Sequence, residues 1–105
     1  NTIRSALTTW GKTLANEVAK SNITVNNILT GYFNTERLEQ LNSEKAKKMG
    51  VKVEEVFDAM KNQVPAKRIG NPKEFGYLAT FLSSDYASYI NGINIAIDGG
   101  LIKSL

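Results

Sequence analysis

Hydrophobic residues recur at helical spacing in the first part of the chain. Five of them follow one another at intervals of four, three, four and four: Ile3, Leu7, Trp10, Leu14 and Val18. This spacing places them on one side of an α-helix. We therefore expect a helix over residues 2–19, ended by Ser21 and Asn22.

Two segments have the patterns of β-strands. Residues 23–29, ITVNNIL, are rich in β-branched side chains and too short for a good helix, which predicts a strand of a largely buried parallel sheet. Further along, Ile93, Ile95 and Ile97 alternate with polar or small residues. This period of two predicts a second strand, which ends at Gly99-Gly100.

Capping residues predict helices between the two strands. Asn34 and Thr35 have side chains typical of a helix N-cap and precede a polar helix, which opens with Glu36 in an acidic first turn and stops near Gly50. A second short helix follows and is closed by Val64-Pro65, because the residue before proline is pushed out of the helical region.

The clearest local signal is the capping box Asn71-Pro72-Lys73-Glu74, which predicts the first turn of another helix. Ser83-Ser84-Asp85 is expected to cap a further turn after it. The resulting order of helix, strand, helices and strand is typical of an α/β protein with a parallel sheet. A buried parallel strand needs a neighbouring strand at each of its edges, and two strands cannot provide this for each other. The chain also begins with Asn1 instead of methionine. We therefore expect further strands N-terminal to these residues.

Composition narrows the possible chemistry. The 105 residues are 42% hydrophobic and 22% charged, as in one globular domain. Because histidine and cysteine are absent, Cys/His zinc sites, thiol nucleophiles and Ser-His-Asp triads are excluded. The acidic residues are scattered, so we assign no metal. The absence of cysteine suits a reducing compartment, and we expect the cytoplasm.

The net charge of +3 does not indicate nucleic-acid binding. The densest basic run, Lys45 to Lys52, is interspersed with glutamates and is typical of a solvated helix face. The apolar runs are much shorter than the roughly 20 residues that span a bilayer. We therefore expect neither a nucleic-acid partner nor a membrane.

Several blocks of sequence, taken together and in order, are similar to one family. They are RSAL with LANEVA in residues 4–19, ITVN in 23–26, TGYFNT in 30–35, VPAKRIGNPKEF in 64–75, and FLSSDYASYING in 81–92 followed by DGG in 98–100. With these gaps they resemble the C-terminal part of a short-chain dehydrogenase/reductase of the 3-oxoacyl-acyl-carrier-protein reductase-like branch.

The resemblance implies the last two strands of a Rossmann-type doubly wound parallel sheet, with flanking helices and a helical substrate lid over residues 36–66. Residues 1–105 would then be the C-terminal part of one dehydrogenase domain, and the N-terminal cofactor half would lie outside the chain. The parent would transfer hydride between NAD or NADP and a small carbonyl or alcohol substrate, as a 3-oxoacyl thioester reductase does. It would be a homodimer or homotetramer, and the 105-residue segment alone would be inactive.

The resemblance also implies site residues. Thr30, Gly31 and Phe33 would line the nicotinamide end of the cofactor, largely through backbone groups. The Thr35 hydroxyl would hydrogen-bond the carboxamide or a phosphate. Arg4 stands at the position of the family's catalytic lysine, whose charge arginine keeps with a different donor geometry. Thr30 stands where the family loop has proline. The eight glycines of this chain do not form the family's Gly-rich dinucleotide fingerprint.

Simpler interpretations stand beside these. Thr35 alone would be a helix cap, Arg4 a surface cation, Asn26 a strand residue satisfied by backbone groups, and Asp98 a structural residue. Three aromatic residues are expected in the core or in subunit contacts rather than stacked on a substrate: Trp10, Tyr86 and Tyr89. For the parent, the alternatives to an oxidoreductase are a non-catalytic nucleotide-binding relative and a segment that serves oligomer assembly.

Overall fold

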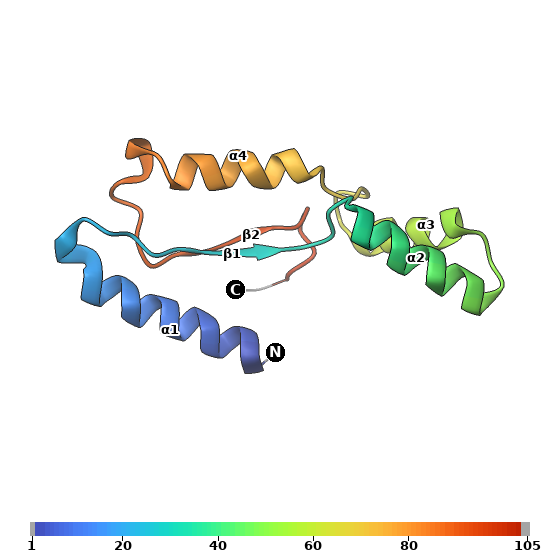
Figure 1. Ribbon diagram of the computed structural model, residues 1–105, viewed down its shortest axis with the longest axis horizontal. Coiled ribbons are helices and arrows are strands. Elements are labelled where there is room, and N and C mark those ends of the chain that lie inside the picture. The colour runs from blue at the N-terminus through green and yellow to red at the C-terminus, as the bar shows by residue number, and fades with distance from the viewer. Residues whose placement is uncertain (1, 104–105) are drawn as a thin grey trace. The chain divides into compact units, whose positions relative to one another are not determined.

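The computed structural model describes the backbone of residues 2–103 and the side chains of residues 5–103 (Figure 1). Its elements, in chain order, are α1 (Thr2–Val18), the 3-10 turn η1 (Ala19–Ser21), β1 (Asn27–Thr30), α2 (Glu36–Met49), α3 (Val53–Gln63), α4 (Pro72–Leu82), the 3-10 turn η2 (Asp85–Ala87) and β2 (Asn94–Ile97). The predicted order of helices and strands is confirmed.

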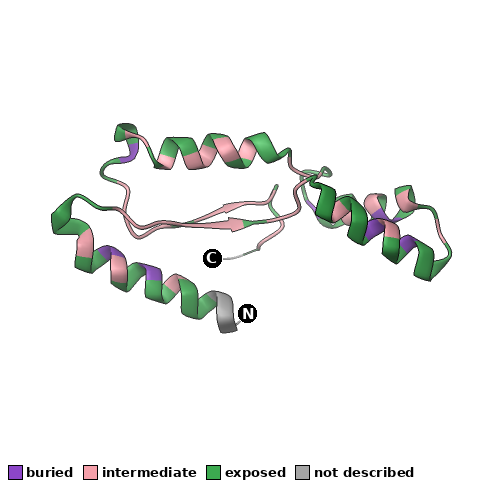
Figure 2. Cartoon of the chain, viewed as in Figure 1, coloured by how far each residue is buried: buried purple, intermediate pink, exposed green. Residues whose placement is uncertain are grey.

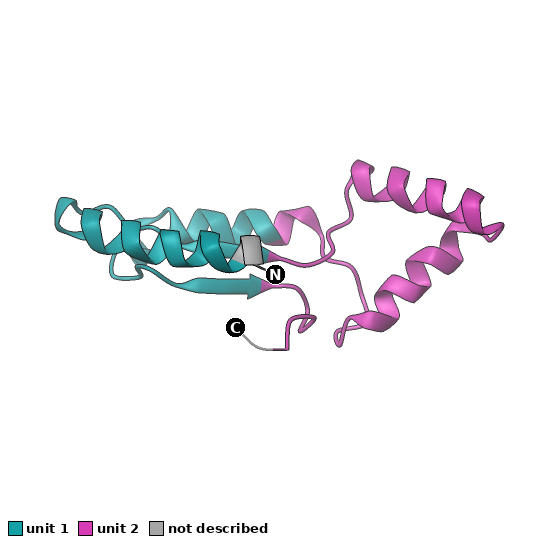
Figure 3. Cartoon of the chain, turned by 90° about the horizontal axis from the view of Figure 1, so that it is seen from below, with its two compact units in different colours: residues 1–29, 75–96 teal, residues 30–74, 97–105 magenta. Residues whose placement is uncertain are grey.

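The chain forms two compact units, each built from segments distant in sequence (Figure 3). The first unit comprises residues 1–29 and 75–96, and the second comprises residues 30–74 and the chain from residue 97 onward. Thr30 and Ile97, the last residues of the two strands, already belong to the second unit.

The two strands pair side by side. The Asn27 N–H donates to the Ile93 carbonyl oxygen at 2.9 Å, and the Gly31 N–H donates to the Ile97 carbonyl oxygen at 3.1 Å. Both partners advance by four residues between these bonds, so the strands are parallel. In the first unit, α1 and α4 lie on opposite faces of the strands (Figures 1 and 3). This is the layered arrangement that covers a parallel sheet.

The first strand is shorter than its sequence predicted, because side-chain amides replace the ladder before Asn27. The Val25 N–H donates to Asn91 Oδ1 at 3.0 Å, and the Ile93 N–H donates to Asn26 Oδ1 at 3.1 Å. The amide nitrogen of Asn26 in turn donates to the Ile90 carbonyl oxygen at 3.2 Å. The interpretation of Asn26 as a polar residue satisfied by backbone groups is therefore confirmed.

The described core is made of small side chains (Figure 2). Its buried hydrophobic residues are Ala15, Ala46, Val56, Val64 and Ala87. On α1 the buried positions are Gly11 and Ala15, and an ideal Cβ at Gly11 would lie 2.7 Å from the Asn27 amide nitrogen. Close approach of this helix to β1 therefore requires small residues, not the large apolar stripe that the helical spacing suggested.

Two large apolar residues of that stripe face solvent, while Leu14 and Val18 are half-buried. Leu7 is 59% exposed and Trp10 is 63% exposed. Tyr86 and Tyr89, on and after η2, are almost fully exposed as well. Of the two places expected for Trp10, Tyr86 and Tyr89, the core is wrong, because all three side chains are exposed. The fully buried positions described in α1 and η2 are held by glycine and alanine. The expected role of the three aromatic residues in subunit contacts remains a prediction.

The second unit is built around α2 and α3, which pack against each other. Asn42 of α2 is buried and its amide nitrogen donates to Met60 Sδ at 3.0 Å. Gly50 ends α2 in the left-handed conformation, with φ of 69°, as its position in the sequence predicted. The last residue of α3 is Gln63, so this helix also ends before Val64-Pro65 as expected.

The capping box at the start of α4 is confirmed. The Lys73 N–H donates to Asn71 Oδ1 at 2.9 Å, and the Asn71 N–H donates to Glu74 Oε1 at 3.0 Å. The further turn expected at Ser83-Ser84-Asp85 is present as η2, with Ser84 in the N-cap position. The expected side-chain cap is wrong, because the Ser84 hydroxyl donates to the carbonyl oxygen of Phe81 at 2.6 Å and makes no cap bond to η2. Within residues 2–103, no helix combines the length and apolar character needed to span a bilayer.

We predict that Asn91→Ala lowers the free energy of unfolding by about 1–3 kcal/mol. The substitution leaves the half-buried Val25 N–H without its acceptor and removes the 3.3 Å bond from Asn91 Nδ2 to the Ala15 carbonyl oxygen. Urea denaturation followed by circular dichroism measures the change. The control is Asn16→Ala at an exposed position of α1, and equal destabilisation by both substitutions would contradict the prediction.

Candidate functional site

Four of the predicted site residues lie in one loop at the carboxyl end of β1. We call residues 30–35 the β1 loop; it holds Thr30, Gly31, Phe33 and Thr35. Ligands of open α/β sheets bind at the carboxyl ends of parallel strands. The fold therefore brings these four residues to the edge where a ligand is expected.

A second segment fixes the middle of this loop. Phe33 and Gly70 form an isolated parallel bridge. The Gly70 N–H donates to the Tyr32 carbonyl oxygen, and the Asn34 N–H donates to the Gly70 carbonyl oxygen, both at 2.9 Å. The β1 loop is thus paired on this side like a strand, although it belongs to no sheet.

Two glycines allow the loop to pack this closely. An ideal Cβ at Gly31 would lie 2.6 Å from Asp98 Cβ and 2.8 Å from Asp98 Cα. At Gly70, an ideal Cβ would lie 2.9 Å from the Phe33 ring. Any side chain at either position would force neighbouring atoms apart, so both contacts require glycine.

Asp98 organises the turn that follows β2. Its Oδ1 accepts the Gly100 N–H at 2.9 Å, and its Oδ2 accepts the Ile102 N–H at 2.7 Å. Both carboxylate oxygens are therefore used by backbone groups, as expected for a structural residue. The turn also accepts the Ala66 N–H at the Gly99 carbonyl oxygen, 3.1 Å away, which ties it to the segment beside Gly70.

Thr35 caps α2, and its hydroxyl can still donate a hydrogen bond. Its Oγ1 accepts the Leu38 N–H at 3.2 Å, which confirms the interpretation as a helix cap. A hydroxyl that accepts one hydrogen bond can donate another. Because Thr35 is exposed, that donor is accessible to a carboxamide or phosphate oxygen. The two interpretations of Thr35 are thus compatible.

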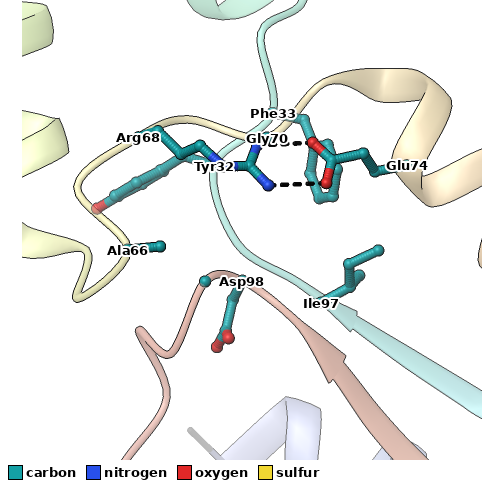
Figure 4. Close-up of a pocket in the computed structure, with 9 residues that line it drawn as sticks. Tyr32, Phe33, Ala66, Arg68, Gly70, Glu74, Ile97 and Asp98 are labelled. Carbon is teal, nitrogen blue, oxygen red and sulfur yellow. Dashed lines mark hydrogen bonds and ion pairs between the residues drawn. The ribbon is translucent and has the colours of Figure 1, made fainter.

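Arg68 and Glu74 form an ion pair beside the loop that the sequence reasoning did not assign to the site (Figure 4). The guanidinium donates from Nη1 to Glu74 Oε1 at 2.7 Å and from Nη2 to Oε2 at 2.9 Å. The hydrogen bonds from Arg68, followed by that from the Asn71 N–H, lower the pKa of Glu74 to about 2. The hydrogen bond with Glu74 raises the pKa of Arg68.

A small cavity lies between these groups (Figure 4). Its lining residues are Tyr32, Phe33, Ala66, Arg68, Gly70, Glu74, Ile97, Asp98 and Gly99. Its volume of about 50 Å³ suits one or a few water molecules and is far below that of a ligand pocket. This cavity is therefore too small to hold a dinucleotide.

Two further residues complete the description of the candidate site. Tyr32 Oη donates to Gln63 Oε1 at 3.1 Å, which links the β1 loop to the end of α3. Arg4 lies in α1, but its side chain is outside the described residues. In the part of the chain that the structure describes, no group of three or more acidic residues is placed to hold a metal ion.

Comparisons with known proteins match this chain to reductases. Residues 1–102 match the family model described as "Enoyl-(Acyl carrier protein) reductase". The NADPH-dependent reductase BacG of Bacillus subtilis is 35% identical over 103 residues, which are 98% of this chain and 40% of that protein. The 3-oxoacyl-[acyl-carrier-protein] reductase MabA of Mycobacterium tuberculosis is 33% identical over 90 residues, or 86% of this chain and 32% of that protein.

A solved structure is similar along the whole chain. L-sorbose reductase of Gluconobacter frateurii, complexed with NADPH and L-sorbose, superposes with a TM-score of 0.91 at 34% identity. The match covers 100% of this chain and 40% of that one. The chain therefore spans about a third to two fifths of the length of these three relatives.

We predict that Gly31→Ala destabilises the protein by about 1–3 kcal/mol, because the new methyl group would overlap Asp98. Gly76→Ala is the matched control: it lies within α4, and an added Cβ meets no atom within 4 Å. Alanine there should stabilise by about 0.5–1 kcal/mol. Thermal denaturation measures both substitutions, and a neutral Gly31→Ala would show that the loop does not pack against Asp98.

We also predict that the Glu74 carboxylate stays charged in mild acid. Because its pKa is lowered from 4.5 to about 2, the stability that the Arg68 pair contributes is present above pH 4.5 and is lost as the pH falls through 2. Titration of the side-chain carboxyl ¹³C shift should give a midpoint near 2. A midpoint near 4.5 would mean that the pair does not form in solution.

Proposed function

Because this chain belongs to the short-chain dehydrogenase/reductase family, we propose that it is part of an oxidoreductase that transfers hydride between NAD or NADP and a carbonyl or alcohol substrate. The observation that carries this proposal is the β1 loop, which lies at the carboxyl end of a parallel strand and is held on both sides by backbone hydrogen bonds. In open α/β sheets, dinucleotides bind outside the carboxyl ends of the parallel strands.

The residues of the loop suit the nicotinamide end of a dinucleotide. Gly31 and Phe33 offer backbone groups, and Gly31 has no side chain in the way of a ligand. Thr30 and Thr35 are exposed, and the Thr35 hydroxyl can donate to a carboxamide or phosphate oxygen while it caps α2. When bound, the nicotinamide supplies or accepts the hydride, and these residues hold and orient it.

Arg4 stands at the catalytic lysine position and keeps a positive charge for the ribose. Arginine offers a planar fork of donors where lysine offers a compact ammonium group. This difference also favours the second candidate function, a non-catalytic relative that binds a nucleotide without turnover. Arg4→Lys separates the two: a gain in turnover supports a weak enzyme, and unchanged absence of turnover supports the non-catalytic relative.

Residues 36–66 form the substrate lid. In support of this assignment, α2 and α3 pack against each other as a helical pair and still leave Leu41 and Met49 about half exposed. An apolar surface of this kind suits an acyl chain or a ring. Closure of such a lid would exclude water from the hydride transfer.

The substrate class that we propose is a medium-sized or bulky carbonyl compound, with a 3-oxoacyl thioester as the first candidate. The match to MabA supports it, and the match to L-sorbose reductase makes a sugar ketone the second compound to test. We further propose that residues 1–105 act within a longer polypeptide whose N-terminal half holds the rest of the cofactor. The exposed Leu7 and Trp10 suit subunit contacts in a homodimer or homotetramer, and a chain without cysteine suits the cytoplasm.

The first experiment is to measure the intact mass of the purified protein and to compare it with 11.6 kDa. The intact protein is then titrated with NADPH and NADH and assayed with 3-oxoacyl thioesters and ketoses. Saturable cofactor binding with cofactor oxidation is the expected result. The 105-residue segment alone should show no oxidation of either cofactor, and turnover by that segment would contradict the assignment of the cofactor half to other residues.

We predict that Thr35→Ala weakens cofactor binding by about threefold to tenfold, the equivalent of one hydrogen bond. Thr35→Ser keeps both the cap and the donor, so its affinity should remain near that of the unsubstituted protein. Thr35→Asp keeps the cap but replaces the donor with a negative charge. If Thr35→Asp binds NADPH normally, Thr35 is a cap alone and does not contact the cofactor.

A further inference from the structure

We propose that Arg68 and Glu74 are positioning residues, which hold the β1 loop in its cofactor-binding conformation by fixing the backbone on both sides of Gly70. This inference rests on the proposed function of the loop. Neither side chain needs to touch the cofactor, because the effect passes through Gly70 to the loop.

The first step is that the loop depends on Gly70. The amide and carbonyl groups of Gly70 bond to Tyr32 and Asn34, the residues on either side of Phe33. A shift of Gly70 would therefore break two hydrogen bonds and the bridge together. The loop residues between β1 and α2 would then lose their support on this side.

The second step is that no regular element holds Gly70 itself. Residues 64–71 contain neither helix nor strand apart from the single bridge, and Lys67 has a φ of 59°, in the left-handed region. At the beginning of this segment, the Ala66 N–H is anchored to Gly99. Between Ala66 and the start of α4, the segment needs side chains to define its path.

The third step is that Glu74 supplies the side chain that defines the path of this segment. It lies in the first turn of α4, and its Oε1 accepts both Arg68 Nη1 at 2.7 Å and the Asn71 N–H at 3.0 Å. Arg68 precedes Gly70 by two residues and Asn71 follows it directly. One carboxylate thus ties both flanks of Gly70 to the helix, and the bidentate geometry of Arg68 restricts the direction as well as the distance.

The fourth step separates positioning from general stability. Arg68 and Glu74 retain 57% and 37% of their side-chain exposure, and exposed ion pairs contribute little to the free energy of unfolding. Loss of the pair should therefore loosen the local backbone and leave the fold in place. A residue needed only for global stability would not behave in this way.

The test uses Glu74→Gln in the intact protein. Glutamine also occurs at this position of capping boxes, so the contact to Asn71 is preserved while the charge on Arg68 is unpaired. The control is Glu17→Gln, because Glu17 lies on α1 outside the proposed lid, is exposed, and has no ion pair within residues 5–103. Arg68→Lys is the second variant, which keeps the positive charge and removes the bidentate geometry.

Three readouts are measured: amide hydrogen exchange at Asn34 and Gly70, the KM for NADPH with kcat, and the urea midpoint. For Glu74→Gln we expect exchange at both amides to quicken at least tenfold and the KM to rise about fivefold, with kcat at saturating cofactor and the urea midpoint unchanged. Arg68→Lys should fall between Glu74→Gln and the unsubstituted protein. Glu17→Gln should change none of the three.

Two outcomes would overturn the inference. Exchange at Asn34 and Gly70 that matches the Glu17→Gln control would show that the pair does not hold the loop. A fall in kcat and in the urea midpoint without a rise in KM would show a structural role alone. Failure of the unsubstituted protein to bind either nicotinamide cofactor is a different result, because it would overturn the proposed function while the exchange data still decide what holds the loop.

Discussion

Parallel pairing of β1 with β2 is the constraint on which the rest of the structure depends. A parallel pair leaves unsatisfied backbone groups at each end of a short ladder, and different groups satisfy them at the two ends. Before β1, the side chains of Asn26 and Asn91 take the place of ladder partners. After β1, the ladder ends at the Gly31–Ile97 bond, and the loop that follows pairs with Gly70 instead. The candidate site is the continuation of this pairing beyond the sheet.

Features set by neighbouring residues could be predicted from the sequence. The capping box at Asn71 and Glu74, the cap at Thr35 and the stop at Gly50 each involve residues within a few positions, so their residue types were sufficient. The start of β1 could not be predicted in this way. It depends on Asn91, 66 residues further along the chain, and nothing near Val25 signals that partner.

The helical spacing in α1 led to a second difference. It correctly predicted a helix, but the helix contacts β1 through Gly11 and Ala15 while Leu7 and Trp10 stay exposed. Hydrophobic spacing shows which residues share a side and does not show which side is covered. For the site, family resemblance placed four residues on the β1 loop, and both the family and its Rossmann-type α/β fold are confirmed. Arg68 was not predicted as a site residue, because its partner Glu74 was already explained as a member of the capping box.

The lack of space at Gly31 and Gly70 has a consequence for how this edge of the protein can diverge. A backbone that touches its neighbours without side chains cannot acquire new specificity by substitution, because every replacement displaces the chain itself. If the β1 loop binds a cofactor as proposed, recognition at Gly31 is limited to main-chain groups, and the Thr35 hydroxyl is the side chain that adds to it. A change in the compound accepted would then have to arise at residues with free space around them, such as the exposed positions of α2 and α3.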